Sequence, residues 1–153
     1  MMPATRSFRL LPRAAAFRAL AIAAALSLSA GPLLAAYELY PGEKLQAIAV
    51  PLKGPLTLSG WTRDGKGVVY SLPVKKGEKF RFRFKPRNNF VGLVIFDEKG
   101  DDNDELFSSQ GVETDKELVA ETDTNWIIRP YYARMSPRRG LGAPYRIEVI
   151  PEK

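Results

Sequence analysis

Twelve residues near the C-terminus, RPYYARMSPRRG at 129–140, combine two adjacent tyrosines with four arginines. A Ser-Pro pair and a glycine punctuate the stretch, which is typical of a loop. Arginine binds carboxylates through two parallel hydrogen bonds, and a loop on a rigid scaffold is well placed to bind. From the residues alone two interpretations stay open, a loop that binds an acidic partner and a basic loop that serves only solubility. The candidate partner-binding residues are Tyr131, Tyr132, Arg134, Arg138 and Arg139.

The sequence contains no histidine and no cysteine. Their absence excludes Ser-His-Asp and Cys-His nucleophiles, a histidine general base and the usual zinc sites. It also excludes disulfides, which are otherwise common in exported domains. We therefore expect a binding protein without a cofactor rather than an enzyme.

The run DEKGDDNDE at 97–105 holds six carboxylates. Oxygen ligands at this density could collect Ca²⁺, but their spacing does not match the EF-hand. Two close carboxylates could also serve a glycosidase, although six acids on one loop do not favour it. We favour a solvated loop without metal, whose charges keep the preceding apolar strand from pairing with other molecules. A Ca²⁺ site is the alternative.

The segment KFRFRFK at 79–85 alternates aromatic and basic residues. Because successive side chains of a strand point to opposite faces, the three phenylalanines lie on one face and the cations on the other. Nucleic-acid bases could not contact both faces at once. The pattern therefore predicts a core strand with Phe80, Phe82 and Phe84 inside and a solvated basic face outside.

The first 36 residues have the layout of a secretory signal, with four arginines, no acid, an apolar run over 19–30 and small residues at Ala35-Ala36. The apolar run is shorter than the roughly 20 residues of a spanning helix. We expect cleavage after Ala36, which leaves residues 37–153 as one periplasmic or secreted bacterial domain without a membrane anchor. The whole chain has 23 Lys+Arg and 17 Asp+Glu, so loss of the four leader arginines leaves a net charge of +2. This small charge argues against nucleic-acid binding.

The remaining chain consists of short apolar segments between turn signals. These predicted strands are 45–52, 56–61, 68–74, 79–85, 90–97, 125–132 and 145–150. Seven to eight strands at this spacing predict an all-β fold, an antiparallel β-sandwich. We expect the polar span from Glu98 to about Val119 to be its longest irregular connection. In the final strand we expect Tyr145, Ile147 and Val149 to face inward.

The strand at 125–132 carries two distinct faces. Its alternation places Trp126 and Ile128, together with Tyr132, on one face. The opposite face holds Ile127, Arg129 and Tyr131. Proline cannot donate a ladder hydrogen bond, so Pro130 predicts that this strand lies at a sheet edge or is bulged there.

Four segments resemble the bacterial pre-peptidase C-terminal (PPC) β-sandwich: VVYSLPVKKGEKFRFRF, FVGLVIFDEKG, NWIIRPYY and YRIEVI. The resemblance runs from about Leu56 to Ile150. More narrowly, the chain resembles the periplasmic inhibitors of goose-type lysozyme. Ser59-Gly60 stands eleven residues before Tyr70, as in that family, and two arginines four residues apart, Arg134 and Arg138, follow the closing strand.

This resemblance implies a protein that blocks the active-site cleft of a goose-type lysozyme through Arg134 and Arg138, followed by Arg139. A tyrosine of that family acts with the arginines, and Gly65 occupies its position here. Tyr131 or Tyr132 would have to replace it. The alternative is a PPC-type module that binds cell-wall glycan or another envelope protein without inhibition.

Overall fold

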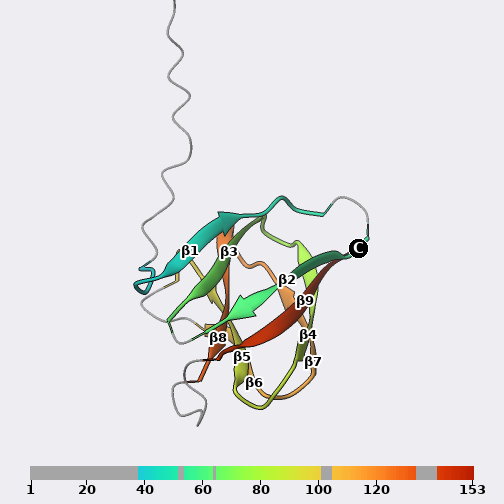
Figure 1. The fold of residues 1–153 in the computed structure, drawn as a ribbon. Helices are drawn as coiled ribbons and strands as arrows, with labels where there is room; N and C mark the ends of the chain where they lie inside the picture. Colours follow the sequence, from blue (N-terminus) through green and yellow to red (C-terminus); the bar gives the residue numbers. More distant parts are fainter. Residues whose placement is uncertain (1–37, 52–53, 64, 101–104, 134–140) are drawn as a thin grey trace, which may run out of the picture. The chain divides into compact units, whose positions relative to one another are not determined.

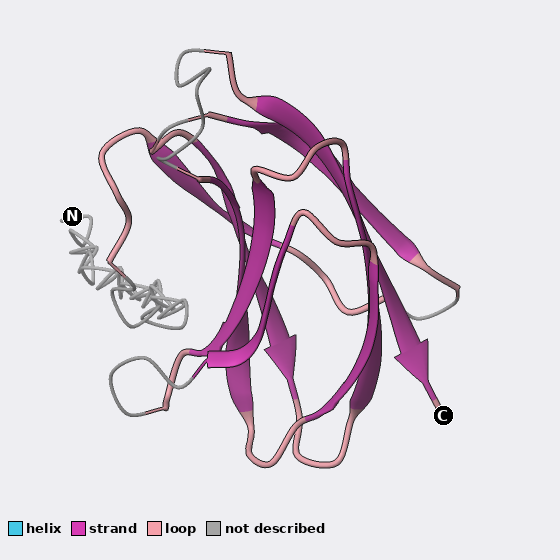
Figure 2. Ribbon diagram, turned by 90° about the horizontal axis from the view of Figure 1, so that it is seen from below, coloured by secondary structure: helices cyan, strands magenta, loops and turns pink. Residues whose placement is uncertain are grey.

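The computed structural model describes residues 38–51, 54–63, 65–100, 105–133 and 141–153. The chain divides into two units, Met1–Leu33 and Leu34–Lys153, and every described residue belongs to the second. Within the described ranges the secondary structure consists of strands and loops, with no helix (Figure 2). Among these residues there is accordingly no helix that is long and apolar enough to cross a membrane.

Two β-sheets form the described part of the chain (Figure 1). The strands are β1 (Glu43–Ala47), β2 (Leu56–Thr62), β3 (Gly67–Val74), β4 (Lys79–Pro86), β5 (Val91–Asp97), β6 (Glu105–Gln110), β7 (Thr114–Val119), β8 (Thr124–Tyr132) and β9 (Ala143–Glu152). The five-stranded sheet has the order β1-β3-β8-β5-β6, and the four-stranded sheet has the order β2-β9-β4-β7. Neighbouring strands are antiparallel except for β1 and β3, which are parallel. The predicted all-β sandwich is confirmed, with nine strands among the described residues.

The expectation of a long irregular connection over 98–119 is wrong, because β6 and β7 lie within it. Each is the last strand of its sheet, pairing with β5 and with β4 respectively. An edge strand buries little of its surface and tolerates charge on its outer face. The sequence TDKELV of β7 is an example. Its acids face solvent, so the sequence lacks the clear apolar alternation by which a strand is recognised.

The alternation of β4 is confirmed. Phe80, Phe82 and Phe84 are each at most 2% exposed, whereas the cations between them lie outside the core. The ring of Trp126 on β8 packs against Phe80 and Phe82, with ring centroids 5.8 and 5.9 Å apart. Burial of one such ring stabilises the fold by roughly 1.5–3 kcal/mol. In the final strand the inward residues are also confirmed, since Tyr145, Ile147 and Val149 are buried.

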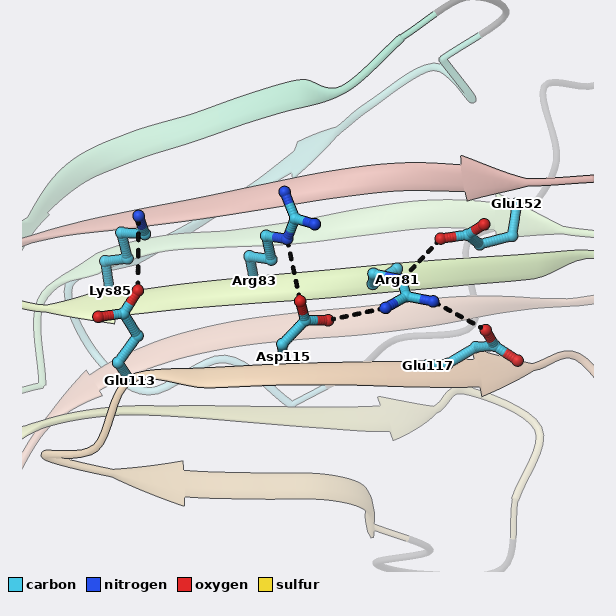
Figure 3. Close-up of polar contacts among 7 residues, drawn as sticks. All are labelled: Arg81, Arg83, Lys85, Glu113, Asp115, Glu117 and Glu152. Atoms are coloured by element: carbon cyan, nitrogen blue, oxygen red, sulfur yellow. Dashed lines mark hydrogen bonds and ion pairs between the residues drawn. The ribbon is translucent and has the colours of Figure 1, made fainter.

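The basic face of β4 meets acids from both neighbouring strands (Figure 3). Arg81 pairs with Asp115, Glu117 and Glu152 at 3.6, 3.4 and 2.6 Å. Two more ion pairs continue the row: Arg83 with Asp115 at 3.0 Å and Lys85 with Glu113 at 3.4 Å. The outward orientation is as expected, but the cations are balanced by acids of β7 and β9 and by Glu113, the residue before β7. This sheet face is therefore no basic surface.

Packing in the core explains why glycine follows Ser59 in β2. Gly60 pairs with Tyr145 across the β2–β9 ladder, and a Cβ on Gly60 would lie 2.6 Å from the Tyr145 hydroxyl. That hydroxyl is 2.8 Å from the hydroxyl of Tyr70, so the two buried groups satisfy each other. Burial and this hydrogen bond raise the pKa of Tyr145. Glycine at position 60 thus makes room for the tyrosine pair.

The expectation for Pro130 is corrected. β8 is an interior strand between β3 and β5, not an edge strand. Its pairing with β3 ends at Ile128, opposite Tyr70, while its pairing with β5 continues through Tyr132. Pro130 therefore lies where β8 has only one partner strand, so its missing N–H interrupts no β3–β8 hydrogen bond.

Candidate functional site

The arginine-bearing segment 134–140 joins the end of β8 to the start of β9, and it lies outside the described residues. The structure therefore does not describe Arg134, Arg138 or Arg139. It does describe both residues that flank the segment, Ala133 and Leu141. The candidate site is built from these flanks and from the strands and turns that contact them.

Both flanks are tied to neighbouring elements by hydrogen bonds. The amide of Ala133 donates to the carbonyl of Phe90 at 2.8 Å. On the other side the indole N–H of Trp61 donates to the carbonyl of Leu141 at 2.9 Å. Gly142 follows with φ of 63°, and a Cβ there would lie 2.2 Å from the carbonyl oxygen of Thr62. Only glycine fits this approach, so the described residues on both sides of the segment are held in place.

Two apolar side chains are exposed at the second flank. Trp61 is 57% exposed and Leu141 is 61% exposed, and the Trp61 hydrogen bond holds them together. Tryptophan is one of the residues enriched at the energetic centres of protein interfaces. Sequence reasoning missed Trp61 because it treated LTLSGW as one apolar run. The alternation was readable, since inward-facing Leu58 and Thr62 put Trp61 on the outer face of β2.

The two tyrosines that precede the segment have different roles. Tyr131 is half-buried and lies over Gly92 of β5, where a Cβ would be 2.1 Å from the tyrosine ring. Burial raises the pKa of Tyr131, and the charge of Glu105 adds to the effect. Tyr131 thus offers a fixed, partly exposed aromatic ring. Tyr132 is only 6% exposed and packs against Phe90 at 6.2 Å, so its ring offers little surface to a partner.

Arg129 lies on the face of β8 opposite Trp126 and Ile128, as the alternation predicted. It is nevertheless only 7% exposed. Its guanidinium pairs with Glu43 of β1 at 2.8 Å and donates to the carbonyl of Glu38 at 2.9 Å. The ring of Tyr40 covers it, with the guanidinium carbon 4.5 Å from the ring centroid. Arg129 therefore clamps the N-terminal segment onto β8.

A pocket of about 390 Å³ opens beside this clamp. The described residues around it include Tyr40, Glu43, Arg63, Lys66, Arg129 and Tyr131. One wall is the turn between β2 and β3, in which Arg63 and Lys66 exchange backbone hydrogen bonds of 2.9 and 2.6 Å. Gly65 lies in this turn with φ of 63°. Tyr40 and Tyr131 line the same pocket as Gly65, the residue that stands at the family's tyrosine position in the sequence resemblance.

The acidic run at 97–105 begins at the opposite end of β5, and its residues 101–104 lie outside the described residues. Asp97 accepts hydrogen bonds from the hydroxyl of Thr124 at 2.5 Å and from the amide of Lys99 at 2.9 Å. Glu98 accepts one from the side-chain amide of Asn125 at 2.5 Å. Across the described ranges, no three carboxylates gather in a group that could hold a metal ion. The first two acids of the run thus fix the loop to β8.

No family model and no curated protein matches the sequence. Solved structures do match the fold. PliG from Aeromonas hydrophila, a periplasmic inhibitor of g-type lysozyme, matches with a TM-score of 0.58 at 17% identity, over 72% of this chain and 100% of that one. The pre-peptidase C-terminal domain of a Bacillus anthracis collagenase matches with a TM-score of 0.53 at 14% identity, over 71% and 97%. A mutant PliG from Escherichia coli gives 0.51 at 16% identity, over 73% and 100%. The chain therefore has the β-sandwich fold shared by these lysozyme inhibitors and the PPC domain.

Proposed function

We propose that this protein is an exported, non-enzymatic binding protein that blocks the active-site cleft of a goose-type lysozyme through its arginine-bearing segment. The observation that carries the proposal is that both residues flanking the arginine-bearing segment, Ala133 and Leu141, are held by hydrogen bonds on this sandwich. The likeness in fold to PliG, a periplasmic inhibitor of g-type lysozyme, supports the same conclusion. The first 36 residues then act as a signal peptide that is removed after Ala36.

The proposed mechanism is electrostatic and steric. A lysozyme hydrolyses its glycan with a carboxylic acid that must be protonated to donate to the leaving oxygen. A guanidinium placed beside that acid lowers its pKa and keeps it ionised, which removes the proton donor. Arg134 and Arg138 are assigned this role, and Tyr131 and Trp61 would contact the rim of the cleft. The segment itself would exclude the substrate.

The test is a cell-wall lysis assay with goose-type, chicken-type and invertebrate-type lysozymes. The inhibitor is purified from the periplasm of cells that express the full chain. Its measured mass should correspond to a protein that begins at Tyr37. We expect inhibition of the goose-type enzyme alone. Arg134→Ala and Arg138→Ala should each weaken binding by roughly 2–5 kcal/mol, the range for removing one side of a buried charge pair.

Lys79→Ala is the charge-matched control, because Lys79 is an exposed cation on β4. If this variant weakens binding as much as the loop variants do, the contact is diffuse electrostatic attraction and the segment has no special role. Inhibition of none of the three lysozymes would instead favour a PPC-type module that binds glycan or another envelope protein.

A further inference from the structure

We infer that the pocket between the β2–β3 turn and β8 is a binding site for a small carboxylate-bearing sugar. Three separate parts of the chain form its walls: the N-terminal stretch at Tyr40, the turn residues Arg63, Gly65 and Lys66, and the end of β8 at Tyr131. Its volume of about 390 Å³ lies at the small end of the range for ligand pockets, which suits one substituted sugar ring. This site is built from described residues and does not depend on lysozyme inhibition.

The aromatic walls provide the apolar contact that a sugar ring needs. Tyr131 is held in place because its ring covers Gly92, so it is ordered before any ligand arrives. Tyr40, on the other side, is 50% exposed. The C–H face of a pyranose ring packs on such rings, and a fixed ring loses little freedom when it binds.

The charges of the pocket favour an anion. Arg129 and Glu43 are both largely buried and neutralise each other at 2.8 Å. Arg63 and Lys66 remain at the mouth, where both are exposed and neither pairs with a carboxylate of the described chain. Asp64, between them in the sequence, lies outside the described residues. A carboxylate satisfies both cations, and arginine binds it bidentately.

The experiment compares N-acetylmuramic acid with N-acetylglucosamine, which differ only in the lactyl ether that carries the carboxylate. Each is titrated into the purified protein, with binding followed by calorimetry. Lactate supplies the carboxylate without the ring. We expect N-acetylmuramic acid to bind at least about tenfold more tightly than N-acetylglucosamine, and lactate to show no saturable binding, because the charge-assisted contact and the ring contact act together.

The double variant Arg63→Gln/Lys66→Gln should abolish the preference for the acidic sugar while leaving the melting temperature unchanged, since both side chains are exposed. Lys79→Gln, a cation on β4, should leave the preference intact. Tyr131→Ala should weaken the binding of both sugars. If that variant does not fold, the double variant at Arg63 and Lys66 tests the inference by itself. Equal affinity for the two sugars, absence of saturable binding to either, or a preference that survives in the double variant would overturn the inference. Arg134→Ala should not affect sugar binding, which separates this result from the lysozyme assay.

Discussion

The ion pair between Glu43 and Arg129 should stabilise the domain far more than its surface ion pairs do. Both side chains are at most 9% exposed, and the carboxylate of Glu43 also accepts a hydrogen bond from the amide of Tyr40 at 2.8 Å. Replacement of Glu43 by glutamine keeps the shape of the side chain and removes its charge. Arg129 then stays buried beside Tyr40 without this counter-charge. The loss of a counter-charge from a buried cation is the main reason that breaking such a pair destabilises a fold.

Removal of one partner from a buried ion pair costs roughly 3–5 kcal/mol. We expect Glu43→Gln to cost about 3 kcal/mol, the lower end of that range, because the amide oxygen still accepts one hydrogen bond. With a urea dependence of about 1.5 kcal/mol per molar for a domain of this size, the unfolding midpoint should fall by about 2 M. Because β1 pairs with β3 alone, amide hydrogen exchange should accelerate first in β1.

The matched control is Glu113→Gln, which removes the same charge from an exposed pair. Glu113 lies 3.4 Å from Lys85, with side chains 71% and 55% exposed. Exposed pairs contribute below about 1 kcal/mol, so this midpoint should move little. If both glutamine variants shift the midpoint by the same small amount and β1 exchange is unchanged, the Arg129 pair is screened like a surface pair. The clamp assigned to it would then be refuted.

Two further predictions concern the core. Phe82→Ala should lower the free energy of unfolding by roughly 3–5 kcal/mol, because it removes a ring packed on Trp126, whereas Arg83→Ala on the outer face should cost below about 1 kcal/mol. Urea unfolding measures both, and the reverse order would mean that the two faces of β4 are wrongly assigned. Gly60→Ala should cost roughly 1–3 kcal/mol through overpacking against Tyr145, while Gly67→Ala, whose Cβ would meet Thr62 at 3.5 Å, should be close to neutral. Equal costs at the two glycines would show that the tyrosine pair moves aside.

The amino-acid pattern alone predicts which side chains enter the core and where most strands run. In β4 the alternation of phenylalanine with basic residues is a local property of the chain, because the pleat sends successive side chains to opposite faces. The same rule assigned Tyr145, Ile147 and Val149 to the interior and put Arg129 on the face of β8 opposite Trp126. It did not reveal β6 and β7, because edge strands face solvent and carry charge where an interior strand carries apolar residues.

The contacts between residues of different strands depend on the tertiary fold and could not be predicted from the local pattern. Arg129 and Glu43 are 86 positions apart in the sequence, and their contact depends on β3 lying between β1 and β8. The pocket likewise joins Tyr40, the turn at Arg63 and the end of β8, none of which shares a local pattern with the others. Strand order and register are set by the packing of the whole core, so a pattern of period two predicts the face of a residue but not its neighbour. For the same reason, the sequence shows Arg129 only as part of a basic stretch, whereas in the fold it is the buried ion-pair partner of Glu43.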